Sequence, residues 1–107
     1  MPPAISQRFI RSHIRAKQYR LTKHATIMRL ERGITIERVL TTGEIIELYP
    51  DDQPYPACLA LGWLKTGDPL HVVCSMGEME PALRIVTVYE PEEALWEADY
   101  KTRRRKN

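Results

Sequence analysis

The chain has 107 residues, a length that predicts a single domain. Its 43% hydrophobic and 28% charged residues are typical of a globular protein and exclude a disordered one. No apolar run approaches the roughly 18–20 residues of a membrane-spanning helix. The start of the sequence also lacks the apolar stretch of a secretory signal. We therefore expect a cytoplasmic protein without a membrane partner.

Charge is segregated along the chain, although the net charge is only +2. Residues 1–42 hold nine basic and two acidic residues, residues 43–100 hold two basic and twelve acidic ones, and KTRRRKN at residues 101–107 holds five basic ones. Basic ends suit a phosphate backbone, so the tail is a candidate RNA-binding arm. The alternatives are that these charges are simply solvated, or that the acid-free start is an organellar transit peptide.

Three helices are predicted in the first 43 residues from capping residues and apolar spacing. A short extended piece at Tyr19 and Leu21 separates the first two. The expected helices and their caps are a helix from Ser6 to about Lys17, a helix over residues 23–32 between Thr22 and Gly33, and a short helix from Thr35 to about Thr41 before Gly43.

Four strands are predicted next, from β-branched runs separated by proline and glycine turns. They cover about residues 44–50, 57–65, 69–76 and 83–90. Their connections are too short for crossovers, so the strands form an antiparallel meander. Pro91, followed by two glutamates, predicts a final helix. The expected fold class is therefore α+β, with helices on one face of a four-stranded antiparallel sheet.

His24 is the first candidate for chemistry. It shares one side of the second helix with Ile27, Met28 and Glu31, near the edge of the expected buried face. A half-sheltered histidine can carry protons, but it can equally bond a strand carbonyl and serve the fold alone. On the same helix, Arg29 and Arg32 share one face, and their two guanidinium groups are a candidate phosphate clamp.

His71 is the second candidate, on the third strand. Alternation puts it on the face opposite Val72 and Cys74, so His71 and Cys74 cannot share a metal. No zinc motif occurs in the sequence, and no metal or other cofactor is expected. Both cysteines, Cys58 and Cys74, are expected as buried, reduced thiols. On the fourth strand, alternation leaves open whether Thr87 and Tyr89 or Arg84 lie beside His71.

Several stretches resemble a bacterial family of unknown function, DUF4258, which is itself distantly similar to BrnT and RelE-type ribonuclease toxins. The quoted stretches are YRLTKHATIMRLERGITIERV, TGEIIELYPDDQPYPACLALGW, PLHVV and IVTVYEPEEALWE. Their most specific pieces are the His-Ala pair, the Arg-Gly-Ile that ends the helix, and Thr-Val-Tyr. The resemblance implies a RelE/BrnT-like domain over residues 19–100, between a basic helical extension at 1–18 and the basic tail at 101–107.

The resemblance implies RNA cleavage and a small antitoxin partner, often one with a zinc-finger domain. Position by position, it assigns the catalytic set to His24, Arg32, His71, Thr87 and Tyr89. The expected nucleic-acid partner is RNA, either free or bound to the ribosome. The basic residues expected to bind it are Lys23, Arg29, Arg103, Arg104 and Arg105.

A metal-independent endoribonuclease needs a base, an acid and a cation at the scissile phosphate. The two histidines, His24 and His71, are the predicted proton carriers, Arg32 the predicted cation, and Tyr89 a group that positions or stacks a base. The alternative is an RNA- or protein-binding module of the same fold without turnover, and a third possibility is a purely structural partner protein.

Overall fold

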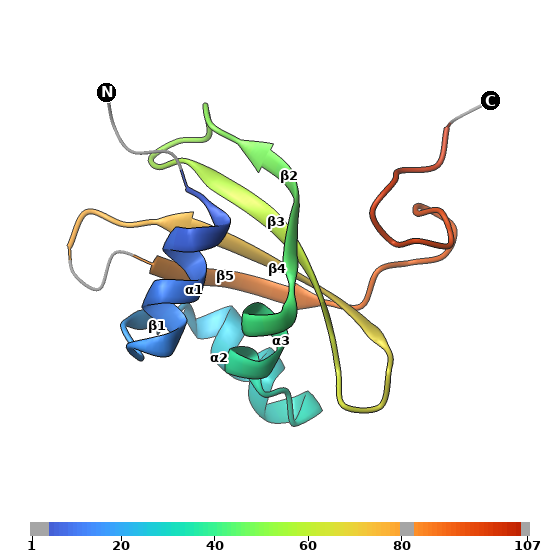
Figure 1. Cartoon of the computed structure of the whole chain (residues 1–107), viewed down its shortest axis with the longest axis horizontal. Helices are drawn as coiled ribbons and strands as arrows, with labels where there is room; N and C mark the ends of the chain where they lie inside the picture. Colours follow the sequence, from blue (N-terminus) through green and yellow to red (C-terminus); the bar gives the residue numbers. More distant parts are fainter. Residues whose placement is uncertain (1–4, 80–82, 106–107) are drawn as a thin grey trace.

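A computed structural model of the chain describes residues 5–79 and 83–105. Three helices and a short strand precede four consecutive strands (Figure 1), which confirms the α+β class. The elements are α1 Gln7–Arg15, β1 Tyr19–Leu21, α2 Lys23–Arg32, α3 Ile36–Thr42, β2 Glu44–Tyr49, β3 Ala57–Trp63, β4 Pro69–Met76 and β5 Leu83–Tyr89.

The three predicted helices are present, and local hydrogen bonds explain the ends of α1 and α2. The Ser6 hydroxyl accepts from the Phe9 amide at the start of α1, and the Thr22 hydroxyl accepts from the Ala25 amide at the start of α2. Gly33 ends α2 with a left-handed φ of 63°, as glycine does most easily. These contacts fix where α1 and α2 begin and where α2 ends, whereas the Thr35 side chain makes no capping hydrogen bond at the start of α3.

The sheet has five strands in the order β1-β5-β4-β3-β2. The predicted antiparallel meander of β2 to β5 is confirmed, with strand bounds within two residues of those expected. The predicted count of four strands is wrong, because β1 pairs in parallel with residues 83–85 of β5. Its three residues are too few to show an alternating pattern, so tertiary pairing alone makes this segment a strand.

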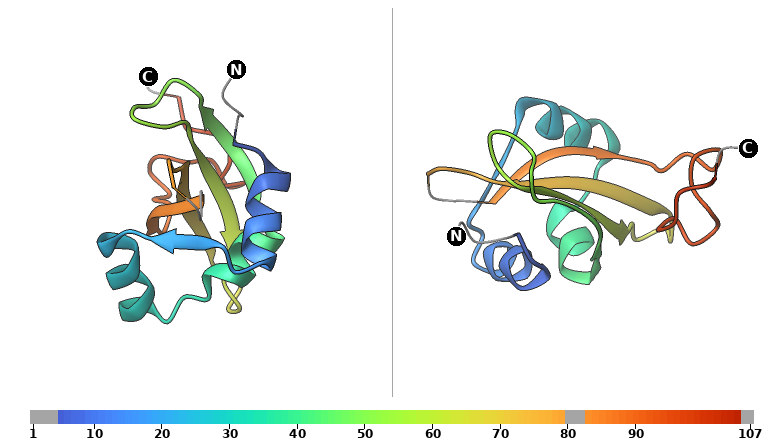
Figure 2. Two further views of the ribbon diagram at one scale, coloured as in Figure 1. Left: turned by 90° about the vertical axis from the view of Figure 1, so that its left-hand side faces the viewer. Right: turned by 90° about the horizontal axis from the view of Figure 1, so that it is seen from above.

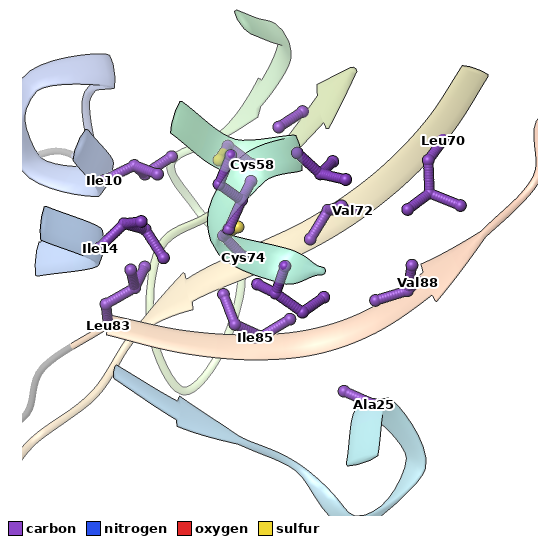
Figure 3. Packing of buried hydrophobic residues seen from close by; sticks show 14 of the residues in the cluster. Ile10, Ile14, Ala25, Cys58, Leu70, Val72, Cys74, Leu83, Ile85 and Val88 are labelled. Atoms are coloured by element: carbon purple, nitrogen blue, oxygen red, sulfur yellow. The ribbon is translucent and has the colours of Figure 1, made fainter. Parts of the chain in front are cut away.

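The main core lies between the sheet and the helices. Figure 2 shows α1 and α3 together on one side of the sheet, and α2 beside β5. Figure 3 shows the packing of this core, whose buried members include Ile10, Ile14, Ala25, Val39, Leu40, Cys58, Leu70, Val72, Cys74, Ile85 and Val88. Cys58 lies opposite Cys74 on neighbouring strands, and both are free thiols, as predicted.

A β-bulge in β5 decides which of its side chains face away from the core. Val73 pairs with Thr87 and Cys74 with Ile85, so Val86 is an extra residue without a partner on β4. Ile85 and Val88 are consequently both buried in the core, although strict alternation would separate them. On the opposite face the strand presents Arg84, Thr87 and Tyr89.

The predicted C-terminal helix is wrong. In residues 91–105 the chain makes a turn in which the Trp96 amide donates to the Glu92 carbonyl. A second turn follows, in which the Tyr100 amide donates to the Glu97 carbonyl, and the chain then folds back on itself. The Asp99 carboxylate accepts from the amides of Lys101 and Thr102, at 2.9 and 3.0 Å, and stabilises that reversal. Trp96 then pairs with Arg103 through an isolated β-bridge. We call residues 91–105 the C-terminal segment.

Gly62 is required where α3 crosses β3. A Cβ atom at this position would overlap the side chain and carbonyl oxygen of Val39. We expect Gly62→Ala to lower the free energy of unfolding by about 1–3 kcal/mol, measured by urea denaturation. Gly33→Ala is the control, because the space there is open and only the left-handed backbone opposes a side chain. A Gly62→Ala variant as stable as the wild type would contradict this packing.

Candidate functional site

A polar cluster occupies the sheet face opposite the helices. His71 on β4 pairs with Tyr89 on β5, and Arg103 reaches the same face from the C-terminal segment. The edge strand β2 adds two neighbouring side chains of this face, Glu47 and Tyr49. We call these five residues the His71 cluster.

His71 is fully enclosed and bonded through both ring nitrogens. Its Nε2 lies 2.8 Å from the Tyr100 carbonyl oxygen, and its Nδ1 lies 3.4 Å from the Tyr89 hydroxyl. The Trp96 ring packs edge-on against it, with 4.5 Å between centroids. A carbonyl only accepts, so Nε2 carries the hydrogen, and we assign Nδ1 as the acceptor of the Tyr89 hydroxyl.

Burial and neighbouring groups shift the pKa of His71 in opposite directions. Removal from water lowers the pKa of His71 below its ordinary value, while the bond to the Tyr100 carbonyl and the nearby Glu47 carboxylate act in the opposite direction. Burial also raises the pKa of the Tyr89 hydroxyl. At neutral pH the pair is therefore an uncharged imidazole that accepts from an intact phenol.

Arg103 and Glu47 form a bidentate ion pair at the edge of the cluster. The guanidinium Nε and Nη2 atoms donate to the two carboxylate oxygens of Glu47, at 2.8 and 3.0 Å. The Tyr49 hydroxyl donates to the same carboxylate. These bonds, that of Arg103 foremost, lower the pKa of Glu47. Arg103 also lies 4.6 Å above the centre of the Trp96 ring, so a cation is held within the cluster.

The basic tail is partly paired with the acidic middle of the chain. Lys101 binds Glu44 at 2.7 Å and Arg104 binds Glu97 at 3.3 Å, both between exposed side chains. Arg105 is exposed. The RNA-binding role of the tail stays a prediction, but two of its three predicted arginines, Arg103 and Arg104, already have carboxylate partners.

The candidate residues of α2 lie apart from the His71 cluster. Lys23 and His24 are exposed on its first turn, and none of the contacts described for His71 comes from α2. The expected buried side of this helix is only partly correct, because Met28 packs against the core but Ile27 is 44% exposed, while Ala25 is fully buried. Ala25, the smallest side chain of α2, packs against the sheet and allows the helix to lie close to β5.

The remaining candidates divide between these two regions. Arg29 is half-buried and lines a cavity of about 340 Å³ with Tyr19 and Glu37. The side chain of Arg32 lies outside the described part of the chain. Thr87 is half-buried on the face of the His71 cluster, opposite Val73. The structure therefore brings together His71, Tyr89 and Arg103.

Sequence reasoning missed four residues that complete the site: Glu47, Tyr49, Trp96 and Tyr100. Glu47 and Tyr49 are two residues apart on a predicted strand, and this spacing places both side chains on one face. Trp96 and Tyr100 belong to the C-terminal segment, for which the sequence predicts a helix and no contact with His71.

Residues 21–90 match the family described as domain of unknown function DUF4258. The chain belongs to the DUF4258 family. The matched range holds His71 and Tyr89, whereas α1 and the C-terminal segment with Trp96 and Arg103 lie outside the DUF4258 match. No curated protein and no solved structure matches the chain.

Membrane-spanning helices and metal-binding clusters are both absent from the described residues. None of the helices there has the length and apolar character needed to cross a bilayer. In the same part of the chain, no three or more histidine, cysteine, aspartate or glutamate side chains gather as a metal site would require.

Acid is expected to destabilise the protein through His71. Its folded-state pKa is lowered, so between that value and the unfolded value near 6.5 the unfolded chain binds more protons. The contribution of His71 to stability is therefore complete above about pH 6.5 and decreases as the pH falls below it. Thermal unfolding between pH 7.5 and 5 measures this, and His71→Gln should flatten the dependence. An identical pH dependence in both proteins would contradict the assignment.

Proposed function

We propose that the protein is a toxin-like, metal-independent endoribonuclease, similar in activity to RelE and BrnT toxins, and that the His71 cluster is its active site. The observation that carries the proposal is the contact of His71 Nδ1 with the Tyr89 hydroxyl beside the Arg103 guanidinium. A proton acceptor, a hydroxyl and a cation thus share one face of the sheet. These are groups that transesterification of RNA requires.

The cluster offers a proton path that leaves the His71 ring enclosed. The half-buried Tyr89 hydroxyl accepts the proton of a substrate 2′-hydroxyl as its own proton passes to His71 Nδ1. The 2′-oxygen then attacks phosphorus, the bond to the 5′-oxygen breaks, and water supplies the proton to that leaving oxygen. The Tyr100 carbonyl holds the ring in the required tautomer, and Glu47 stabilises the imidazolium that forms. His71 afterwards returns its proton to solvent through Tyr89.

Arg103 supplies the positive charge near the reacting phosphate. It is exposed at the edge of the cluster, and its present partner is the Glu47 carboxylate. A phosphate offers the same bidentate geometry as that carboxylate, so RNA and Glu47 compete for this guanidinium.

Removing the competing charge should strengthen RNA binding. We expect Glu47→Gln to bind a short RNA several-fold more tightly, because Arg103 loses its ionic partner and becomes available to a phosphate. Fluorescence anisotropy with a labelled oligoribonucleotide at fixed salt measures this. Glu97→Gln is the matched control, because it removes the carboxylate partner of Arg104 outside the cluster, while the Arg104 guanidinium stays bonded to the Glu93 carbonyl. Weaker binding by Glu47→Gln would show that the carboxylate holds Arg103 in place for RNA.

The proposed partners are RNA, free or ribosome-bound, and a small antitoxin that neutralises the toxin. Inducible expression tests both. Wild-type protein should arrest growth and shorten cellular RNA, the Tyr89→Phe variant should do neither, and co-expression of any small reading frame that neighbours the gene should restore growth if it encodes the antitoxin. Equal growth with wild-type and variant protein, at equal expression, contradicts the toxin assignment.

The second candidate function is a non-catalytic RNA-binding module. The enclosure of His71, which has 0% exposure, favours it, since both ring nitrogens already have partners inside the protein. Salt-dependent RNA binding without any cleavage, weakened equally by each arginine substitution, would support this function instead.

A further inference from the structure

We propose that a second cavity on the same sheet face binds one guanine base of the RNA strand that reaches the His71 cluster. This inference rests on the proposed function, because it treats the ligand as part of an RNA. The cavity has a volume of about 220 Å³, a size suited to a single planar base. It is lined by Asp52, Gln53, Pro54, Tyr55, Ala57, Val73, Ser75, Arg84 and Val86.

The floor of the cavity is formed by three neighbouring strands. Ser75 on β4 pairs with Ala57 on β3 and with Arg84 on β5. Val73 and Ser75 follow His71 at alternate positions of β4, so they face the same way as the His71 cluster. The bulge at Val86 turns this residue toward the cavity as well. A ligand in the cavity therefore lies on the same face as the proposed active site.

Two polar groups in the cavity have no hydrogen-bond partner within the described part of the chain. Ser75 is only 6% exposed, and its hydroxyl has no hydrogen-bond partner among the described residues. Arg84 is half-buried and makes no hydrogen bond or ion pair within residues 5–79 and 83–105. A buried hydroxyl without a partner is unfavourable, and so is a partly desolvated guanidinium. A bound group with polar edges would satisfy both.

The remaining lining favours a base over a bare phosphate. Ala57, Val73 and Val86 give an apolar floor, and the Tyr55 ring offers an aromatic surface for stacking. Among the described residues of the lining, Arg84 is the only cation, and the lining also includes Asp52, whose carboxylate repels a phosphate. A planar, neutral ligand suits this combination better.

Guanine is the base whose edges match these groups. Its O6 and N7 atoms both accept, and an arginine donates to them through two parallel hydrogen bonds. Its amino group at N2 donates, which suits a carboxylate such as that of Asp52. Adenine presents an amino donor in place of O6, opposite a guanidinium that only donates.

The distance along β4 between the cavity and the His71 cluster is short enough for one RNA strand to reach both. Ser75 is four residues beyond His71, or about 13 Å along a strand that rises ~3.3 Å per residue. A nucleic-acid strand advances ~3.4 Å per stacked nucleotide, so about four nucleotides or fewer separate the guanine from the reacting phosphate. The cavity would thus determine which sequence is presented to Tyr89.

The test is an NMR titration of the full-length protein with guanosine 5′-monophosphate, adenosine 5′-monophosphate and inorganic phosphate. We expect saturable shifts with the guanine nucleotide at residues around Ser75. We also expect at least ~10-fold weaker binding for Arg84→Gln, and weaker binding for Ser75→Ala. Arg38→Gln is the control, because Arg38 is an exposed arginine on α3 outside this lining.

Three results would overturn the inference: no binding of the guanine nucleotide, equal affinity for all three ligands, or equal loss in Arg84→Gln and Arg38→Gln. Equal affinity would indicate a phosphate site instead. The spectra of each variant also report whether it is folded. Because this readout needs no turnover, guanine binding by a protein that cleaves no RNA would refute the proposed function alone.

Discussion

Tyr89→Phe is expected to lower the rate of RNA cleavage by about 10²–10⁴-fold, the usual contribution of a positioned proton carrier. The change removes one hydroxyl, which accepts the substrate proton and donates to His71 Nδ1 at 3.4 Å. The ring remains to pack against His71. Because the hydroxyl acts in the reaction step, kcat should fall while KM changes little. Single-turnover cleavage of a short labelled RNA measures the effect.

His24→Gln is the matched control for this prediction. His24 is exposed on α2, and no contact joins it to the His71 cluster in the described part of the chain. Its replacement should leave the cleavage rate close to that of the wild type. The reverse result, loss of cleavage in His24→Gln with full activity in Tyr89→Phe, would return the catalytic role to the helix histidine.

Trp96→Ala is expected to lower the free energy of unfolding by about 3–5 kcal/mol, the usual effect of deleting a large buried aromatic side chain. Trp96 is only 2% exposed, packs edge-on against His71 and lies beneath the Arg103 guanidinium. Its loss should also admit water to the imidazole and raise the pKa of His71 toward the ordinary value. Denaturation and NMR titration of His71 measure the two effects, and Trp96→Phe serves for the titration if the alanine variant does not fold.

Leu95→Ala is the control that separates the effect of burying Trp96 from the effect of truncating any side chain in the C-terminal segment. Leu95 is the preceding residue and is 52% exposed, so its truncation should change stability by no more than about 0.5 kcal/mol. A Trp96→Ala protein as stable as Leu95→Ala, with an unchanged His71 titration, would show that the C-terminal segment does not enclose the site.

Local signals in the sequence were sufficient for the helices and the meander. Ser6, Thr22 and Gly33 mark helix ends by chemistry that acts within a few residues, and short turns leave consecutive strands no other pairing. The helix prediction for the C-terminal segment was wrong because contacts between distant residues, rather than local signals, determine its conformation. Pro91 and its glutamates do favour a helix start, but the distant contact of Trp96 with His71 and the reversal at Asp99 determine the conformation.

The candidate site was only partly predictable, because its members come from four separate parts of the chain. Strand alternation placed His71 away from the core, but the bulge at Val86, which puts Tyr89 and Arg84 on one face, has no local sequence signal. The segregation of charge did contain a second clue. A basic tail and an acidic middle can pair within one chain, as Arg103 and Glu47 do, as well as with an external phosphate.

The chemistry of the RNA ends tests the central claim most directly. Purified protein is incubated with a short RNA of defined sequence, and the products are weighed by mass spectrometry. If the His71 cluster activates a 2′-hydroxyl, the upstream fragment ends in a 2′,3′-cyclic phosphate, the downstream fragment begins with a 5′-hydroxyl, and neither forms with Tyr89→Phe. Intact RNA with the wild-type protein, or the same fragments from the wild type and Tyr89→Phe, would contradict the account.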